Sequence, residues 1–510
     1  MKIVLIFPRV AEYQAGQAPL GLASLAGYLR KNGYKDIKIL DFSFHKSLDQ
    51  AYKEIKKIKA DLVGISAMSY LMEPSLKIAS IIKQNNPNII IAFGGPHATM
   101  YPEDVARENN VDIVAYGEAE TTFLNLIQHI EQEKSLKEVR GIAYKTPEGQ
   151  VVKNPPAELI KDLDEIGMPA RDMIPTFKKY ISLVPFFPLE FPMTTMVTSR
   201  GCPYSCTFCQ PTLEKLFGKI PRTRSAKNIV DEMEYLQNHY KIKSIFFSDS
   251  LFTYKRSRTM DICKEIVDRK LDITWECQSR VNTIDKELVV WMKKANCKVL
   301  SFGVESGSQR ILDFAGKGTT KSQISNAFKI CREVGIVASC NYMIGFPTET
   351  KEDLKMSLQQ MLETKPDLLN VYITSPVPGT AMYDAAKGMN LIKTEDLNII
   401  GRRNDADGMF SKFKSDELDD KYLENFQQRF IREYARMLLK EGAKLNKKSL
   451  MKVVFDRYWG IAARKSPIEA VKDFNNIFLS GITGKIRRYA TKIKEDQEEQ
   501  EKAEEILAKR

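Results

Sequence analysis

Short apolar runs alternate with amphipathic helical segments over the first 130 residues. The apolar runs predict strands at 2–7, 37–40, 62–66, 89–93 and 113–116, and the intervening segments predict helices at 20–32, 48–58 and 72–85. Short buried strands between helices are typical of a doubly wound parallel sheet. Ligands of such sheets bind beyond the carboxyl ends of the strands, which here are the loops 66–68, 94–97 and 117–120.

Prolines interrupt the next segment, residues 136–190. Seven of them lie there, too many for continuous helix, so we expect a connector. The strand and helix alternation then returns, with six candidate strands at 194–198, 244–248, 274–278, 299–303, 337–343 and 369–373. Six such units in series predict a partial (β/α)6 barrel, in which chemistry takes place at the carboxyl ends of the strands.

Helical periodicity replaces this pattern after about residue 390. One helical stripe is formed by Phe426, Phe430, Ile431, Tyr434, Leu438 and Leu439. We therefore expect an α/β protein with a doubly wound domain at 1–135, a connector at 136–190, a barrel domain at 191–388 and a helical region at 389–510.

The composition is that of an ordinary globular chain, with 43% hydrophobic and 28% charged residues. No uncharged apolar run reaches about 18 residues, the length that predicts a membrane-spanning helix. The apolar start of the chain is too short for a signal peptide and fits a buried first strand. These features together favour a cytoplasmic protein.

Positive charge is concentrated near the C-terminus. Residues 421–490 hold 16 Lys and Arg against 6 Asp and Glu, in a chain whose net charge is +12. A basic segment attracts an anionic partner, such as a lipid surface, a nucleic acid or an acidic substrate. The alternative is a solvated helical face.

The eight cysteines do not form a disulfide framework. Three are clustered with the spacing C-x3-C-x2-C at Cys202, Cys206 and Cys209, and five are scattered singly. Three thiolates would leave one iron of a [4Fe–4S] cluster open to bind and activate a substrate. A zinc loop is the alternative, but zinc usually takes four protein ligands in paired clusters, and the chain has no second CxxC.

This motif, placed directly after the first barrel strand, resembles that of the radical S-adenosylmethionine (SAM) superfamily. The resemblance implies a [4Fe–4S] cluster on the three cysteines, SAM on the open iron, and Phe208 near the SAM adenine. The segment 246–253 is similar to the family's F-x-D-D-x-F-T, although Ser250 stands where a second Asp is common. The segments 345–350 and 376–380 are similar to later loops of the family.

Three further residues are expected at the SAM site. The segment 303–308 resembles the family's SAM ribose and methionine site, which implies roles for Glu305 and Ser306. Arg280, at the end of the third barrel strand, is expected at the SAM carboxylate, with a surface ion pair as the alternative. The remaining cysteines are expected to be core thiols, although Cys277 or Cys340 lies near enough to a strand end to face the active site.

The first domain resembles the cobalamin-binding domain of cobalamin-dependent radical SAM proteins and would then be Rossmann-like. The matching segments are 19–22, 64–66, 94–99 and 117–121. The resemblance implies cobalamin contacts from Ser66, Gly94, Gly95, His97, Gly117 and Glu118. The cobalt-ligating D-x-H-x-x-G motif is absent, so we do not assign His45 to cobalt. The alternative is a scaffold that has lost cobalamin.

The combined resemblance implies C-methylation of an unactivated carbon. A 5′-deoxyadenosyl radical would abstract hydrogen from the substrate, and methylcobalamin would supply the methyl group. Expected partners are a hydrophobic small molecule (a lipid such as a hopanoid, a tetrapyrrole or a natural product) and a flavodoxin or ferredoxin electron donor. We also consider peripheral membrane contact through residues 421–490 and expect no nucleic acid.

Three alternatives to methylation can be compared with the sequence. The first is radical-mediated ring formation, as in anaerobic magnesium-protoporphyrin monomethyl ester cyclases. A methylthiotransferase is disfavoured because such proteins carry three cysteines in the N-terminal domain, whereas residues 1–135 contain none. A cobalamin-binding sensor or carrier would make the cysteine motif superfluous.

Overall fold

The computed structural model describes residues 1–8, 18–45, 48–181, 188–209, 211–393, 413–415 and 417–442. The chain divides into two compact units, residues 1–183 with 188–441, and residues 184–187 with 442–510. All of the second unit except Gly442 lies outside the described ranges.

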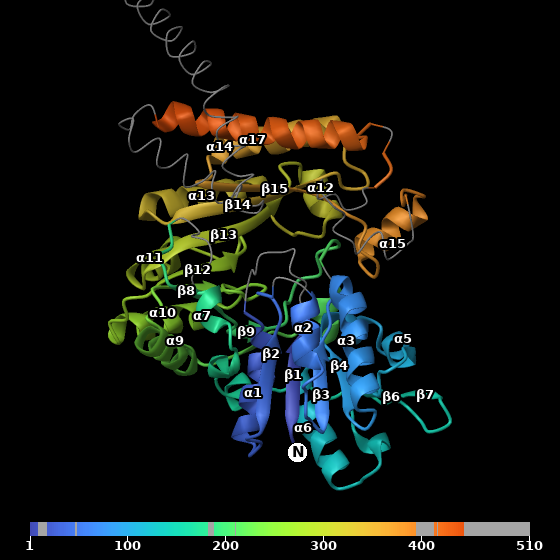
Figure 1. Ribbon diagram of the computed structural model, residues 1–510. Coiled ribbons are helices and arrows are strands. Elements are labelled where there is room, and N and C mark those ends of the chain that lie inside the picture. Colours follow the sequence, from blue (N-terminus) through green and yellow to red (C-terminus); the bar gives the residue numbers. More distant parts are fainter. Residues whose placement is uncertain are drawn as a thin grey trace, which may run out of the picture. The chain divides into compact units, whose positions relative to one another are not determined.

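The N-terminal sheet has seven strands in the order β2-β1-β3-β4-β5-β6-β7 (Figure 1). The strands are β1 Ile3–Phe7, β2 Ile37–Asp41, β3 Leu62–Ser66, β4 Ile90–Gly94, β5 Ile113–Ala115, β6 Ile142–Lys145 and β7 Val151–Lys153. The helices are α1 Leu20–Lys31, α2 Leu48–Ile55, α3 Met72–Asn85, α4 Pro96–Met100, α5 Pro102–Arg107 and α6 Ala119–Glu131. The first five strands are parallel, whereas β6 and β7 are antiparallel additions.

Both faces of this sheet are buried, which explains why its strands are continuous apolar runs rather than alternating ones. Along β1, Ile3 and Leu5 pack in the core that includes α1 and α6. Val4 and Ile6 point the other way, into the core that includes α3.

The segment 136–190 is more than a connector. Its β6–β7 hairpin pairs with β5 and so extends the N-terminal sheet past residue 135. The proline argument excluded a long helix but gave no information on strands, because short strands tolerate flanking prolines. The rest of the segment holds short pieces, Leu136–Glu138, Leu163–Ile166, Arg171–Met173 and α7 Phe177–Tyr180.

Six parallel strands form the second sheet, in the order β15-β14-β13-β12-β11-β8. They are β8 Met193–Met196, β11 Ser244–Phe247, β12 Thr274–Ser279, β13 Cys297–Glu305, β14 Val337–Ile344 and β15 Leu368–Ile373. Its helices are α8 Pro211–Phe217, α9 Ala226–Tyr240, α10 Arg256–Asp268, α11 Lys286–Lys294, α12 Gln309–Phe314, α13 Lys321–Val334, α14 Lys351–Thr364 and α15 Ala381–Gly388. The predicted α/β class, with a Rossmann-like sheet followed by a partial barrel of six strands, is confirmed.

Alternation along these strands separates two faces. On β12, Trp275 and Cys277 are fully buried among residues of the neighbouring helices. The residues between them, Glu276 and Gln278, therefore point to the opposite side, which we call the inner face. A two-stranded ribbon of β9 Ser199–Arg200 and β10 Arg222–Thr223 follows the carboxyl end of β8.

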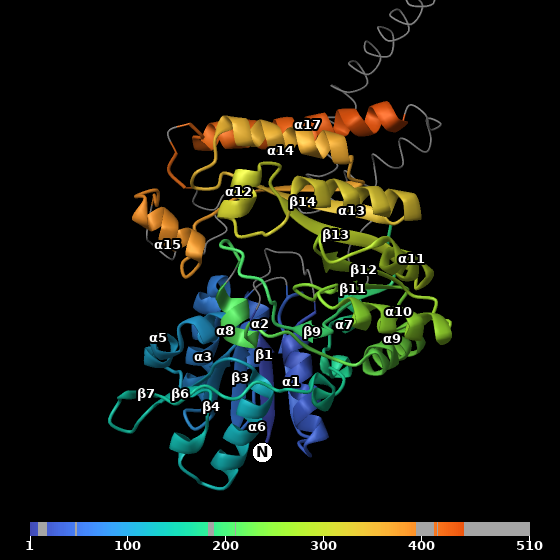
Figure 2. The same cartoon turned by 180° about the vertical axis from the view of Figure 1, so that it is seen from behind.

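The last described helix, α17 Asp420–Gly442, covers the edge of this sheet. Phe426, Phe430 and Tyr434 are buried, as the apolar stripe predicted. Gln427 Nε2 donates to the Val371 carbonyl at 2.8 Å and the Tyr434 hydroxyl to the Asp367 carbonyl at 2.6 Å, so the helix protects edge strand β15. Both views place α17 alongside α14 (Figure 2).

None of the described helices is long and apolar enough to cross a membrane. The part of the basic segment 421–490 that follows residue 442 lies outside the described residues.

Candidate cluster and cofactor site

The cysteine loop begins where β9 ends, at a turn that requires glycine. Gly201 has φ +91°, and a Cβ there would lie 3.0 Å from the carbonyl oxygens of Gly218 and Ile220. Further along, the backbone N–H of Thr207 donates to the Ala315 carbonyl at 2.9 Å, and that of Cys209 to the Cys206 carbonyl at 3.1 Å. The loop is thus held at both its start and its middle.

The three loop cysteines differ in environment from the other five. Cys202 and Cys206 are partly exposed and Cys209 is exposed. The other cysteines, Cys263, Cys277, Cys297, Cys331 and Cys340, have 0% exposure. Burial raises the pKa of Cys263 and of Cys331 to about 12 and also raises the pKa of each of the other three well above its usual range. These five are therefore inert core thiols, Cys277 and Cys340 included.

Accessible thiols grouped in one loop are the donor set that an iron–sulfur cluster requires. No three Cys, His, Asp or Glu side chains in the described part of the chain are already gathered at metal-ligand distances. The three residues therefore fit a cluster by donor chemistry.

Arg280, at the end of β12, lies against this loop. Its Nη1 is 3.6 Å from Cys206 Sγ, and its guanidinium carbon lies 3.6 Å from the centroid of the Tyr204 ring. Its Nη2 donates to the carbonyl of Lys317. Arg280 is 6% exposed and makes these buried contacts rather than a surface ion pair.

Glu305 ends β13 on the same side of the site. It has φ +68°, unusual for a residue with a side chain, and its Oε1 accepts a hydrogen bond of 2.8 Å from Lys317 Nζ. The same Nζ lies 5.9 Å from the centroid of the Phe208 ring. The structure thus brings Phe208, Arg280 and Glu305 together around Lys317.

Sequence reasoning missed Lys317, although a signal was present. It is flanked by Gly316 and Gly318, whose φ angles are +60° and +61°. Two left-handed glycines around one lysine indicate a backbone that approaches another segment closely, and a Cβ on Gly316 would lie 3.2 Å from the Ser205 carbonyl.

Ser306 is placed differently from its neighbour in the motif. Its side chain is fully buried, with its Oγ 3.2 Å from Ser357 Oγ on α14, and it accepts a hydrogen bond from the Ser308 N–H at 3.1 Å. These contacts orient the loop after β13 against α14. The role of Ser306 toward SAM stays a prediction.

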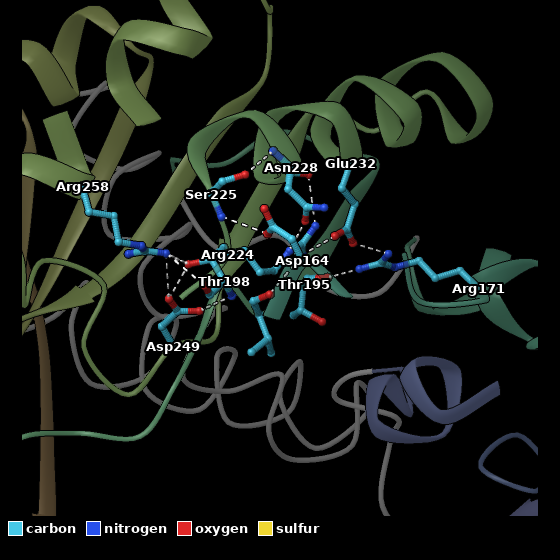
Figure 3. A network of polar contacts seen from close by, with 11 residues as sticks. Asp164, Arg171, Thr195, Thr198, Arg224, Ser225, Asn228, Glu232, Asp249 and Arg258 are labelled. Carbon is cyan, nitrogen blue, oxygen red and sulfur yellow. Dashed lines mark hydrogen bonds and ion pairs between the residues drawn. The ribbon is translucent and has the colours of Figure 1, made fainter. Parts of the chain in front are cut away.

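A buried polar network holds the chain that leads into the cysteine loop (Figure 3). Asp249 accepts hydrogen bonds from the Thr198 N–H and the Ser199 hydroxyl, both at 2.6 Å. Arg258 donates to the Thr198 carbonyl at 3.1 Å, and the backbone N–H of Arg224 donates to the same oxygen at 3.0 Å. Asp249 thus fixes the end of β8, three residues before Gly201.

The same network continues to Glu232 on α9 (Figure 3). Its carboxylate lies between the guanidinium groups of Arg171 and Arg224. Burial by itself would raise the pKa of Glu232, but the two arginines lower it below its usual range, so the carboxylate stays ionised.

Five of the six predicted cobalamin contacts lie at the carboxyl edge of the N-terminal sheet. Ser66 ends β3, Gly94 ends β4, Gly95 and His97 follow in the turn and first turn of α4, and Gly117 follows β5. No atom lies within 4 Å of where a Cβ on Gly117 would be, so there is open space beside this residue, whereas a Cβ on Gly95 would lie 3.1 Å from the Ala67 carbonyl oxygen.

The two histidines near this edge have protein partners. His97 Nδ1 lies 3.0 Å from Ser69 Oγ, and burial lowers the pKa of its ring, which favours neutral imidazole. His45 Nε2 lies 3.0 Å from Glu54 Oε1.

Glu118, the sixth predicted contact, has both carboxylate oxygens occupied by protein. It accepts hydrogen bonds from Arg200 at 3.0 Å and from Arg222 at 2.8 and 2.9 Å. Arg200 also donates to Glu120 at 2.6 Å. These four residues join the loop after β5 to the strand that enters the cysteine loop, and a cobalamin contact by Glu118 stays a prediction.

Comparisons with known proteins agree with this architecture. Residues 8–127 match the B12 binding domain and residues 196–361 match the radical SAM superfamily. An uncharacterized methyltransferase of Pyrococcus horikoshii is 37% identical over 77% of this chain and 85% of its own. An anaerobic magnesium-protoporphyrin IX monomethyl ester cyclase of Rubrivivax gelatinosus is 29% identical over 84% of this chain and 78% of its own.

A solved structure shares the fold of both domains. It is that of the cobalamin-dependent S-adenosylmethionine radical enzyme OxsB with aqua-cobalamin and S-adenosylmethionine bound. The TM-score is 0.71 at 20% identity, covering 91% of this chain and 72% of that one. With both domain matches, the 37% identical relative and the accessible thiol loop, the chain belongs to the cobalamin-dependent radical SAM enzymes, which use a [4Fe–4S] cluster, S-adenosylmethionine and cobalamin.

Proposed function

We propose that this enzyme C-methylates an unactivated carbon of a hydrophobic small molecule, such as a hopanoid or other lipid, a tetrapyrrole or a natural product. The observation that carries the proposal is the 37% identity to a methyltransferase over 85% of that protein's length. It is supported by an accessible thiol loop bordered by Arg280 and by the Glu305–Lys317 pair.

Each group of residues has a distinct part in this proposal. The cluster would be held by Cys202, Cys206 and Cys209. SAM would contact Phe208, Arg280 and Glu305, where two cations and a carboxylate match its own carboxylate, ammonium and ribose groups. Cobalamin would lie against Ser66, Gly94, Gly95, His97 and Gly117. When bound, these cofactors supply a radical and a transferable methyl group, and the protein supplies binding, orientation and exclusion of water.

Ring formation without methyl transfer is the second candidate. It is favoured by the relative of 29% identity that is a magnesium-protoporphyrin ester cyclase. Both candidates need a small substrate and a reductant, and they differ in whether the product gains carbon.

The cofactor content can be tested with the full chain purified without oxygen. We expect about four irons per chain after reconstitution and about one cobalt after addition of hydroxocobalamin. Cys206→Ala should lose the iron and keep the cobalt, whereas Cys263→Ala, a core thiol, should keep both. Iron without cobalt would contradict the cobalamin site, and zinc in place of iron would contradict the cluster.

The reaction can be tested with methyl-labelled SAM, a reductant and candidate lipids or tetrapyrroles. Methylation predicts label in the product, whereas cyclisation predicts an unlabelled product that has lost hydrogen. Label that appears equally with Cys206→Ala would rule out a reaction that depends on the cluster.

A further inference from the structure

A row of polar side chains lines the inner face of the six-stranded sheet. On β12 the outward residue Trp275 packs against Phe247 and Phe252, with ring centroids 5.5 and 5.4 Å apart, and its Nε1 donates to the Ala295 carbonyl at 2.5 Å. Because successive strand residues point to opposite faces, Glu276 and Gln278 point inward. Both side chains are partly exposed although β12 is an inner strand of the sheet.

The neighbouring strands continue this row. Asn341 Nδ2 on β14 donates to Ser301 Oγ on β13 at 3.2 Å, and Asn370 Nδ2 on β15 donates to Asn341 Oδ1 at 3.1 Å. The strand register places Ser301 beside Gln278 and Asn341 beside Asn370. We call these five residues, Glu276, Gln278, Ser301, Asn341 and Asn370, the inner polar row.

The two ends of this row differ in whether their side chains have hydrogen-bonding partners in the protein. Ser301, Asn341 and Asn370 bond to one another, whereas no donor or acceptor among the described residues pairs with the side chain of Glu276 or Gln278. Burial alone raises the pKa of Glu276 to about 7, with no cation to hold it ionised. Neither side chain is fully buried, so water can reach these groups, and a ligand that binds there would replace that water with its own hydrogen-bonding group.

The distance between the Glu276 carboxyl and the cysteine loop determines how long a ligand must be to contact both. Glu276 precedes Arg280 by four residues on the same extended segment, which corresponds to about 13 Å. Arg280 lies 3.6 Å from Cys206 Sγ. A molecule whose polar end meets Glu276 would therefore have to extend about 13 Å to place carbon near the cysteine loop, where the radical would form.

We propose that Glu276 and Gln278 form a substrate subsite that binds a hydroxyl, amine or amide N–H group, with Glu276 as acceptor and Gln278 as a second hydrogen-bonding partner. This inference rests on the proposed function, because it assigns to that reaction a substrate that is amphiphilic rather than a bare hydrocarbon. The reacting carbon belongs to the apolar part of the substrate. The donor group fixes the position of the substrate in the barrel and so determines which carbon reacts.

Deuterium transfer into 5′-deoxyadenosine can test the subsite without knowledge of the natural substrate. The reconstituted enzyme is given SAM, a reductant and one perdeuterated probe at a time: 1-decanol, decylamine or 1-methoxynonane, an ether of similar size that has no donor. We expect the alcohol and the amine to transfer at least about ten times more deuterium than the ether, the factor that one hydrogen bond of about 1.4 kcal/mol provides.

Variants identify the residues responsible. In Glu276→Ala the preference for donors should fall to about twofold or less, and Gln278→Ala should weaken it less. Glu158→Ala, which removes an exposed carboxylate elsewhere, should keep the wild-type preference. Equal transfer from all three probes in the wild type, or an unchanged preference in Glu276→Ala, would overturn the subsite.

A second measurement separates this subsite from the reaction itself. At about pH 6, below the pKa of about 7, decylamine should shift the carboxyl of Glu276 from acid to carboxylate, seen as loss of a carboxylic acid infrared band in the wild type and not in Glu276→Gln. The isosteric variant also guards against a loss of folding in the alanine variant. Absence of 5′-deoxyadenosine together with this band change would refute the proposed function and keep the subsite, whereas an unchanged band would refute the subsite alone.

Discussion

At the scale of single residues, Glu349 is unusual because its carboxyl group is buried, whereas glutamate usually lies at the protein surface. Its Oε2 accepts hydrogen bonds from the backbone N–H groups of Gly345 and Phe346, while its Oε1 is buried without a partner in the described structure. Burial raises the pKa of Glu349 to about 8, although the two N–H groups oppose the shift. The carboxyl is therefore mostly protonated at neutral pH in the folded state.

This raised pKa predicts a pH dependence of stability. The native state holds the proton more tightly than the unfolded chain, so stability falls as pH rises from about 4.5 to about 8, by an amount on the order of a few kcal/mol. Glu349→Gln should lose less stability than the wild type between pH 5.5 and 8 in urea unfolding, because an amide does not titrate. Glu352→Gln, on the exposed side of the same helix start, should keep the wild-type slope, and identical slopes for wild type and Glu349→Gln would contradict the prediction.

Sequence motifs predicted much of the candidate site. They did not reveal which of its side chains make hydrogen bonds within the protein rather than being free to contact a cofactor. The cysteine spacing, Arg280 and Glu305 were predicted from local pattern, and the structure brings them together. The contacts of Ser306 and Glu118 depend on helices and arginines far away in the chain, which no local motif encodes. Glu276 carried no motif, because its inward direction follows only from the packing of Trp275.

At the scale of elements, the segment that follows β8 is held by side chains from two neighbouring parts of the barrel. The end of β11 contributes Asp249 and helix α10 contributes Arg258, and both bond to Thr198. The cysteine loop starts three residues after Thr198. Fixing the backbone at Thr198 therefore fixes where the loop, and with it the three thiols, begins. The segment that resembles F-x-D-D-x-F-T thus has a structural role, through Asp249, that the resemblance did not specify.

Asp249→Asn should loosen this strand end without changing its shape. The amide nitrogen cannot accept a hydrogen bond, so either the Thr198 N–H or the hydroxyls of Thr198 and Ser199, which share Oδ2, lose their acceptor. Arg258, whose Nη2 lies 3.8 Å from Asp249 Oδ2, also loses its ion pair, and we expect the change to cost about 3 kcal/mol. Iron bound after reconstitution should fall by more than about half, measured by metal analysis beside chemical unfolding. Asp261→Asn, exposed on α10, serves as the matched control. Full iron content with an unchanged cluster spectrum in Asp249→Asn would show that the strand end is not needed for the loop.

Strand positions were predicted well where both faces of a strand are buried. The six barrel strands overlap their predicted ranges, although β13 runs two residues beyond each predicted end. The hairpin β6–β7 was missed, because its strands are three or four residues long and form through pairing with β5 rather than through an apolar run of their own.

At the scale of the whole molecule, the two sheets are joined by a buried charge cluster of Glu118, Glu120, Arg200 and Arg222. The side chains of the two glutamates are 2% and 5% exposed, so solvent screens these pairs weakly. Burial by itself would raise the pKa of Glu120, but Arg200 lowers it below its usual range. The paired residues are 80 to 104 positions apart in sequence, a separation that pattern analysis does not bridge.

This cluster predicts that the two sheets unfold together. In a Trp459→Phe background, far-UV circular dichroism of the whole chain and tryptophan fluorescence should report coincident thermal transitions, since the two remaining tryptophans, Trp275 and Trp291, lie in the barrel and residues 1–190 contain none. Replacing Glu118 and Glu120 by Gln leaves two arginines buried without carboxylates, at a cost of about 3–5 kcal/mol for each broken pair. The circular dichroism transition should then begin at lower temperature than the fluorescence transition. Glu103→Gln, in an exposed pair with Lys153 in the same domain, should keep them coincident. If the transitions of the double variant stay coincident, the two sheets are coupled through other contacts, and the charge cluster only orients the entry to the cysteine loop.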